Sequence, residues 1–329
     1  MKHLNKQLGI SLVEVLVALV ISLFLLAGIV QVYTGNKTAF RFTNSLAEIQ
    51  ENGRFAIETM TQDLRLAGEW GCVEFDSDDT DNFNNTIPGV MPLYDADFHD
   101  FVGEEAIEGT DGVTDTIIVR GGRPGQANVE SPFHAAGSNE LIITNSGNFE
   151  ANDIVLVARC GANDLLIDAE ADLLRVSVVD PGPVPSKLKL TLDGNKSQQF
   201  EKDAMVIGLQ TVTYSIAPGL SGEPALFRRV FDQPAQELVE GVEDMQILYG
   251  VDGADGDGFP NQYLPADNAL DYESVVSVRV QLLVRSIDDF VTEDPQTYTY
   301  AGNTVTPADR RIRQVFSTTI ALRNRIGSI

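Results

Sequence analysis

Residues 10–30 constrain the fold of this chain more than any other segment. Only four of these 21 residues are not plainly apolar, namely Ser11, Glu14, Ser22 and Gly28. As a helix rising about 1.5 Å per residue, the segment spans roughly 31 Å, which is close to the hydrocarbon thickness of a bilayer. An ionisable group such as Glu14 inside a membrane span usually marks a functional site. We therefore expect a transmembrane helix with a functional carboxylate near its N-terminus.

A short basic leader, residues 1–9, precedes this span and ends in Gly9. Its lysines, Lys2 and Lys6, place the leader in the cytoplasm and the rest of the chain outside, by the positive-inside rule. An ordinary secretory signal is cut after its apolar core, and residues 31–35 offer only a weak site for that cut. The order of basic leader, glycine, apolar run and glutamate resembles the start of a type IV prepilin.

This resemblance implies that a prepilin peptidase cuts between Gly9 and Ile10. Ile10 would then become the N-methylated first residue, and the apolar helix would stay in the mature protein. Glu14 would be the fifth residue of that protein, where its carboxylate pairs with the α-amino group of a neighbouring subunit during assembly. A buried charge without a partner is costly, so the pairing would set the axial register between subunits. The alternative is a carboxylate that reaches the lipid headgroups from a position near the interface.

The charge of the chain is concentrated beyond the helix. Residues 1–66 carry six basic and five acidic side chains, whereas the whole chain has a net charge of −25, so residues 67–329 account for −26. Such an acidic body is repelled by phosphate backbones, which argues against nucleic acid as a partner. It is also repelled by anionic headgroups, which leaves the N-terminal helix as the membrane anchor.

The two cysteines, Cys72 and Cys160, both lie in the part expected outside the cytoplasm. A disulfide between them is the natural expectation in an oxidising compartment, and it would stabilise the fold by roughly 4–5 kcal/mol in the chain-entropy model. The alternative is two unrelated free thiols. Neither cysteine lies in a C-x-x-C pair, which disfavours redox catalysis and structural zinc.

Hydrophobic periodicity predicts an α+β fold in which a long N-terminal helix packs its outer half on a mostly antiparallel β-sheet body, and the resemblance implies that this helix is of the pilin type. We expect four regions: a removed leader (1–9), a transmembrane half-helix (10–30), an amphipathic outer half (31–67) and a β-rich body (68–329). No proline occurs before residue 88, and small or apolar residues continue at helical spacing to about Leu66. Strands are expected at residues 116–120, 140–144, 154–159, 173–179, 187–192, 206–216, 226–231, 245–249, 275–285 and 314–322.

Three further groups of segments resemble minor pilins of the PilW type. They are residues 52–56 (NGRFA) with 63–72 (DLRLAGEWGC), residues 237–246 (ELVEGVEDMQ) with 249–252 (YGVD), and residues 316–325 (FSTTIALRNR). These segments cover both ends and part of the middle of the chain. Residues 76–235 resemble no family that we can name.

Catalytic motifs are absent from the sequence. His99 and His134 are isolated, and no zinc-protease, nucleophile-elbow, phosphate-loop or dinucleotide motif is present. We therefore expect no enzyme and no cofactor, with Ca²⁺ as the exception to test. Residues 252–258 (DGADGDG) could bring the carboxylates of Asp252, Asp255 and Asp257 together on a calcium ion, although their spacing is not that of an EF-hand. A solvated acidic loop is the equal alternative.

The resemblance implies a non-catalytic minor pilin that helps to initiate type IV pilus assembly and sits at or near the pilus tip. Its partners would be the prepilin peptidase, the inner membrane, other minor pilins, the major pilin and a tip-associated adhesin. The chain would cross the inner membrane once, with its body in the periplasm, and then enter the pilus at the cell surface, with twitching motility and adhesion as consequences. One alternative is a J-type minor pseudopilin of a type II secretion system. Another is a membrane-tethered Ca²⁺-binding or adhesive protein that never polymerises.

Overall fold

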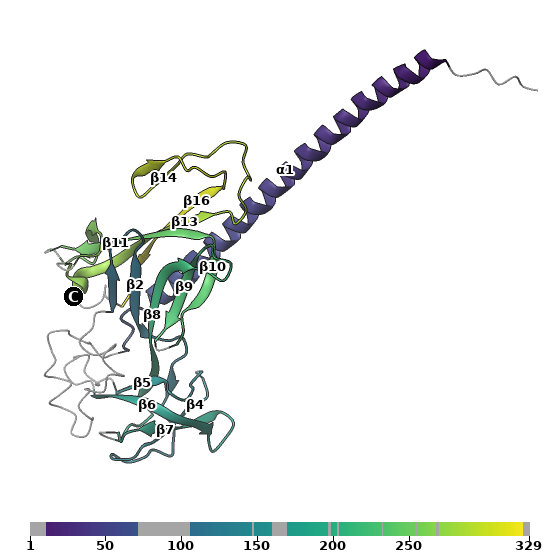
Figure 1. Ribbon diagram of the computed structural model, residues 1–329. Helices are drawn as coiled ribbons and strands as arrows, with labels where there is room; N and C mark the ends of the chain where they lie inside the picture. The colour runs from purple at the N-terminus through teal and green to yellow at the C-terminus, as the bar shows by residue number, and fades with distance from the viewer. Residues whose placement is uncertain are drawn as a thin grey trace, which may run out of the picture.

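The structure, a computed structural model, consists of one long helix and a body of antiparallel strands (Figure 1). It describes residues 11–71, 106–146, 148–159, 170–196, 199–202, 204–231, 233–253, 256–267 and 270–324. The expected α+β class and the expected arrangement of a helix on a mostly antiparallel sheet body are therefore confirmed.

The helix α1 extends from Leu12 to Arg65 without a break, which agrees with the expected end at about Leu66. At 54 residues it is roughly 80 Å long. Its N-cap is Ser11, and it ends where the N–H of Leu66 bonds the carbonyl of Asp63 at 3.0 Å. Gly68 follows at a φ of 69°, a left-handed conformation that favours glycine and turns the chain away from the helix axis.

The strands lie between residues 107 and 321, and a single-turn 3₁₀ helix, η2 (Tyr272–Ser274), precedes β13. They are β1 (Ile107–Thr110), β2 (Thr116–Gly122), β3 (Ala127–Asn128), β4 (Glu140–Thr144), β5 (Ile154–Arg159), β6 (Glu170–Pro181), β7 (Lys187–Asp193), β8 (Met205–Pro218), β9 (Pro224–Val230), β10 (Gln236–Glu240), β11 (Val242–Asp252), β12 (Pro260–Leu264), β13 (Val275–Arg285), β14 (Tyr298–Tyr300), β15 (Asn303–Val305) and β16 (Arg313–Ala321). Each of the ten expected runs overlaps one of these strands. The six that the sequence analysis missed, β1, β3, β10, β12, β14 and β15, have five residues or fewer, which is too short for alternation to be recognised.

The large sheet has ten strands and is organised around β8. Along one path its order is β1-β2-β8-β5-β6-β7-β4, and β9 and β10 extend from β8. The short strand β3 also pairs with β8, and the adjacent Val129 forms an isolated bridge to Ile143 of β4. Strands β8, β5, β6, β7, β4 and β3 therefore close into a ring, which we call the distal ring. Figure 1 shows its strands β4 to β7 on the side of the body away from α1.

A second sheet of four strands has the order β12-β11-β13-β16, and β14 and β15 form a separate hairpin. In this sheet, Val278, Val280 and Leu282 of β13 alternate with residues on the opposite face, and their side chains are buried. They belong to a core cluster that also contains Ile49, Ala56, Met60 and Leu64 of α1. The second half of α1 is therefore packed against this sheet.

The helix packs on the body over a shorter length than the sequence predicts. The apolar stripe was expected to be covered from residue 31 onward, but every residue from 11 to 44 is exposed. Val32 keeps 64% of its surface and Phe42 keeps 37%, and burial begins only at Ser45. Periodicity shows that a helix face needs a covering partner, but it does not show which chain provides it.

Candidate functional site

The first turn of α1 is closed by a capping box that involves Glu14. The N–H of Glu14 donates to the Ser11 hydroxyl at 3.2 Å, and the N–H of Ser11 donates to the Glu14 carboxylate at 3.3 Å. Two backbone donors that have no partner within the helix are thereby satisfied. This role was not among the predictions from the sequence, although the S-x-x-E spacing of residues 11–14 is its usual signature. Glu14 is thus placed at the positive end of the helix dipole.

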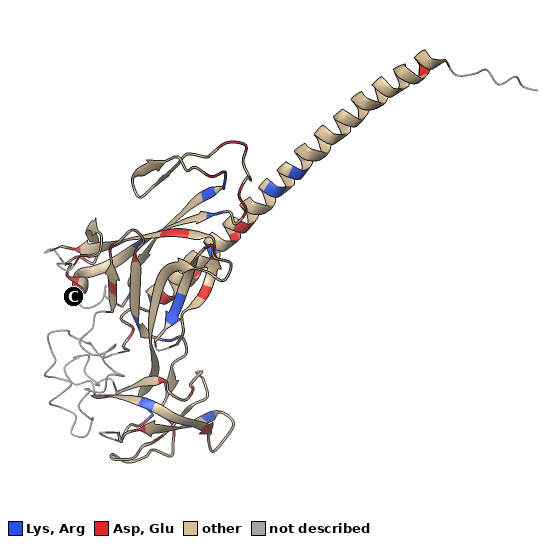
Figure 2. Ribbon diagram, in the orientation of Figure 1, with Lys and Arg blue, Asp and Glu red and all other residues tan. Residues whose placement is uncertain are grey.

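The bare part of α1, residues 11–44, is longer than a membrane span. These 34 residues extend about 50 Å as a helix, whereas a bilayer's hydrocarbon core is about 30 Å thick. Of the helices that the structure describes, α1 is the one long and apolar enough to cross a membrane. Figure 2 shows few charged residues along this projecting part and many on the body. In a membrane, about 20 Å of exposed helix would therefore remain between the hydrocarbon core and the packed half of α1.

A buried ion pair fixes the other end of α1 to the large sheet. Arg228 of β9 donates to both carboxylate oxygens of Asp63, at 2.8 Å and 3.2 Å, and the Tyr214 hydroxyl of β8 donates to the same carboxylate. The Asp63 side chain is only 10% exposed. Burial raises the pKa of Tyr214, so it stays neutral and acts as a donor. Because both partners are far from Asp63 in sequence, this contact requires the complete fold.

The helix also lies very close to the four-stranded sheet. A Cβ atom on Gly53 would come within 2.3 Å of the Phe316 ring of β16. One residue earlier, the Asn52 side chain donates to the carbonyl of Glu240 at 3.2 Å. Gly53 lies within the 52–56 segment of the PilW resemblance and Phe316 begins the 316–325 segment, so the structure brings these two segments into contact.

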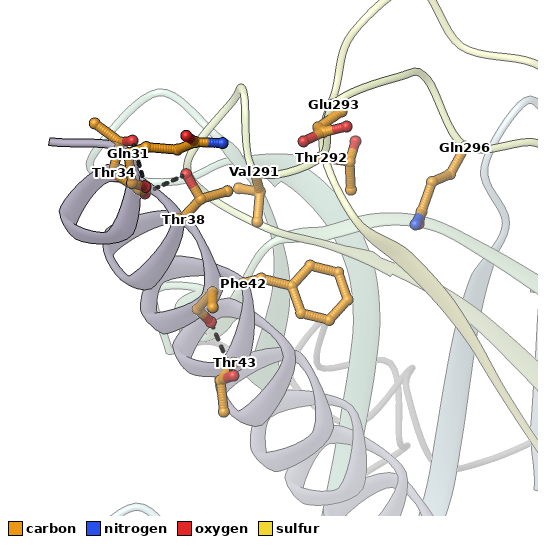
Figure 3. Close-up of a pocket in the computed structure, with 11 residues that line it drawn as sticks. Gln31, Thr34, Thr38, Phe42, Thr43, Val291, Thr292, Glu293 and Gln296 are labelled. Carbon is orange, nitrogen blue, oxygen red and sulfur yellow. Dashed lines mark hydrogen bonds between the residues drawn. The ribbon is translucent and has the colours of Figure 1, made fainter. Parts of the chain in front are cut away.

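An open groove marks the place where the body first approaches α1 (Figure 3). Thr34, Thr38 and Phe42 line it from the helix, and Val291 and Glu293 line it from the loop between β13 and β14. The cavity volume is about 690 Å³. Its lining contains neither histidine nor cysteine.

Beside the groove, Arg41 forms an ion pair with Asp288 at 3.6 Å and donates to the carbonyl of Asp289 at 3.4 Å. Both partners are well exposed, so the ion pair contributes little to stability. Its position nevertheless shows that the loop meets the helix near residue 41, just before the packed half of α1 begins.

A second polar cluster, which we call the arginine network, joins the two sheets. Glu243 of β11 bonds Arg285 at 3.1 Å and Arg313 at 2.6 Å, and Arg313 holds both oxygens of Asp309 at 2.7 and 2.8 Å. Arg285 also bonds the carboxylate of Glu223, the residue before β9. The network consists of Glu223, Glu243, Arg285, Asp309, Arg311 and Arg313. The hydrogen bonds from Arg313 lower the pKa of Asp309 to about 2.

The acidic loop expected to bind calcium is described only in part. Asp252 accepts from the N–H of Gly258 at 2.8 Å, and Asp257 accepts from the N–H of Phe259 at 2.9 Å, whereas Asp255 lies outside the described residues. Within the described ranges, no three His, Cys, Asp or Glu side chains converge on a common point suited to a metal ion. The Ca²⁺ site therefore stays a prediction.

Several other predicted site residues lie outside the described ranges. Gly9 and Ile10 of the cleavage site do, and so do Cys72 and Cys160 of the expected disulfide. Their roles stay predictions. His134 lies between β3 and β4 of the distal ring, and its side chain is 3.6 Å from the Glu140 carboxylate.

The fold and the bare helix define a class of protein. A single apolar N-terminal helix, half uncovered and half packed on an antiparallel sheet, is the architecture expected of a membrane-anchored pilin. Residues 4–30 match the family model described as Prokaryotic N-terminal methylation motif. Residues 213–324 match the family model described as Type IV Pilus-assembly protein W.

These two matches confirm the resemblance to a PilW-type prepilin-like chain and support a type IV pilus-related pilin. None of the curated proteins compared with the chain matches it significantly. The second match runs from the middle of β8 through β16, so it covers the four-stranded sheet and the strands around α1. The distal ring up to β8 lies outside both matches.

Proposed function

We propose that this chain is a non-catalytic minor pilin that helps to initiate type IV pilus assembly and sits at or near the pilus tip. The observation that carries this proposal is the uncovered stretch of α1. The apolar stripe that packs on the body at Ile49 and Ala56 continues outward through Ala39 and Gly35, where it is bare. Because the stripe extends beyond the membrane, another chain is needed to cover it.

A filament of parallel helices satisfies this requirement. Each subunit would leave the membrane with its bare helix surrounded by those of its neighbours, while the body would remain at the surface. The acidic body cannot replace these contacts, because its net charge of −26 disfavours close packing of like surfaces. The helix therefore acts first as the membrane anchor and then as the part of the chain buried in the filament.

Glu14 supplies the charge that selects the register of this packing. In the structure its carboxylate bonds the N–H of its own Ser11 through one oxygen. A carboxylate accepts more than one hydrogen bond, so the second oxygen stays available for the α-amino group of a neighbouring subunit after cleavage before Ile10. In the interior of a filament such a pair is shielded from solvent, and loss of one partner leaves a buried charge uncompensated.

The partners and location follow from this role. We propose that the prepilin peptidase, the other minor pilins, the major pilin and a tip-associated adhesin act on or bind the chain in turn. The body would lie in the periplasm before assembly and at the cell surface afterwards, with twitching motility and adhesion depending on the finished pilus. The PilW match over residues 213–324 favours this proposal over the J-type pseudopilin of a secretion system.

The test is a set of three substitutions at the capping box, scored by the number of pili per cell. Glu14→Gln keeps a hydrogen-bonding side chain but removes the charge, and we expect it to lower the count by about tenfold or more. Glu14→Ala should behave in the same way. Ser11→Ala removes the cap, which costs only about 1 kcal/mol of helix stability, and leaves the charge in place, so it should stay near the wild-type count.

Mass spectrometry of the mature N-terminus provides the independent control. A methylated Ile10 supports the proposal, whereas a chain that starts beyond residue 30 contradicts it. A wild-type number of pili from Glu14→Gln would favour a tethered protein that does not polymerise. Loss of protein secretion with normal pili would instead favour the pseudopilin.

A further inference from the structure

The outermost strand of the four-stranded sheet, β16, has an open edge. It pairs with β13 on one side and ends the sheet order on the other (Figure 1). The β14–β15 hairpin lies against the start of this strand, where the Tyr298 ring is 5.6 Å from the Arg313 guanidinium, and the Tyr300 hydroxyl donates to the carbonyl of Gln281 on β13. The rest of the strand runs beside α1, which contacts it through the face that carries Phe316.

Hydrogen bonds at the two ends of β16 show which backbone groups point outward. Leu322 donates to the carbonyl of Val276, and Ser286 donates to the carbonyl of Ile312. In an antiparallel pair the bonding residues alternate, so the even-numbered residues of this strand bond β13. The N–H and C=O groups of the odd-numbered residues point away from β13: Val315, Ser317, Thr319 and Ala321. None of the residues that the structure describes bonds these groups.

This edge lacks the devices that usually protect a strand from pairing. From Gln314 to Ala321 the strand contains no proline and no charged side chain, and its register against β13 has no bulge. The other edges that the structure describes are different. On the opposite side of this sheet, β12 has five residues, begins with Pro260 and forms a bulge with β11. In the large sheet, β1 has four residues.

A second copy of the chain does not fit this edge. Two β16 edges paired antiparallel would be related by an axis perpendicular to the sheet. Because α1 lies on a face of that sheet, the axis would reverse the helix of the second copy, and the two membrane spans would point in opposite directions. A parallel pairing would bring two bodies of net charge −26 side by side.

We propose that the outer edge of β16 is a docking site for an extended segment of a different subunit, which adds a fifth strand to the four-stranded sheet. The segment would be about seven residues long, as strands usually are. Its side chains would be apolar on the side of Phe316 and Ile320, and polar on the side of the exposed Ser317 and Thr319. It would be neutral or basic, because the body is acidic. This inference rests on the proposed function in taking the partner to be another pilus subunit.

Hydrogen exchange resolved to single residues gives the first test, on the full-length chain in a detergent micelle and in assembled pili. In the micelle the amides of Thr318 and Ile320 should be protected, and those of Ser317 and Thr319 should exchange freely. In pili, Ser317 and Thr319 should become protected. Free exchange of these two amides in pili would overturn the proposal.

A proline placed on the edge gives the second test. Ser317→Pro removes one outward N–H and crowds the edge, but it leaves the bonds to β13 intact, because edge strands accept proline. We expect about tenfold fewer pili, and a wild-type number from the matched control Ser317→Ala, which keeps the N–H. Continued protection of Thr318 and Ile320 would show that the variant is folded. A folded Ser317→Pro chain with a wild-type number of pili would overturn the proposal.

The identity of the partner is tested with a photo-crosslinking phenylalanine analogue in place of Thr319, with Gln262 on β12 as the control position. A crosslink from position 319 to a different pilus subunit supports the proposal, and one to a second copy of the chain overturns it.

The result with Glu14→Gln separates this inference from the proposed function. If that variant blocks assembly and Ser317→Pro does not, only the edge inference fails, whereas normal assembly by both variants removes the proposed function as well.

Discussion

At the scale of single residues, the contact between Gly53 and Phe316 decides how closely α1 approaches the sheet. Any side chain at position 53 would have to displace the ring, since a Cβ atom would lie 2.3 Å from it. A glycine within a helix costs about 1 kcal/mol relative to alanine, so its presence here has to be offset by the packing it permits. Gly35, on the bare part of the same helix, has no atom within 4 Å of its would-be Cβ.

We predict opposite effects of the same substitution at these two positions. Gly53→Ala should lower the free energy of unfolding by about 1–3 kcal/mol, because it overpacks a buried contact. Gly35→Ala should leave it unchanged or raise it by up to about 1 kcal/mol. Denaturant unfolding of the full-length chain in micelles measures both effects, and a Gly53→Ala chain as stable as the wild type would contradict this account.

At the scale of elements, the arginine network joins β9, β11, β13 and β16 at one end of the two sheets. Although partial burial opposes it, hydrogen bonds from Arg285 and Arg311 lower the pKa of Glu223, and those from Arg313 lower the pKa of Asp309 to about 2. A carboxylate whose pKa is lowered on folding contributes stability above its unfolded pKa, and this contribution is lost as the pH falls through the folded value.

The body should therefore lose stability in acid over a defined range. We predict that the thermal midpoint of unfolding falls between about pH 5 and pH 2, where Glu223 and Asp309 take up protons. In Asp309→Asn, which cannot titrate, the midpoint should be lower at pH 7 and should change less with pH over the same range. Parallel pH profiles of the variant and the wild type would show that the network does not cause the acid sensitivity.

At the scale of the whole molecule, the body contains separate cores. One cluster combines α1 with the four-stranded sheet and the nearest strands of the large sheet. A second fills the distal ring and includes no residue of α1, and a third lies around Trp70 and Ile207 between them. The family match covers most of the first cluster's strands but none of β3 to β7. Strands β3 to β7 of the distal ring therefore lie outside the matched part of the body that packs against the helix.

Because the cores are separate, we predict that they can be destabilised separately. Leu190→Ala, in the ring core, should cost about 2–5 kcal/mol and reduce the hydrogen-exchange protection of β5 to β7. The amides of β13 and of the packed half of α1 should keep their protection. Met60→Ala, in the helix core, should produce the reverse pattern. An equal loss of protection across both regions in either variant would show that the body unfolds as one unit.

Local patterns in the sequence were enough to predict the long helix and every strand longer than five residues. A helix or strand repeats its contacts every few residues, so the spacing of apolar side chains records it. The strand β13, for example, was predicted with its observed bounds, Val275 to Arg285. The S-x-x-E cap at Ser11 was also present in the sequence and could have been found there.

Only the tertiary structure decided which segments meet. Asp63 contacts Tyr214 and Arg228, which are 151 and 165 residues away, and the distal ring closes through a bridge at Val129. It also decided that α1 is covered from Ser45 and not from residue 31, and that β16 lies at a sheet edge. The physical reason is that pairing between distant segments depends on the global arrangement of the chain, which a repeat of two or 3.6 residues does not encode.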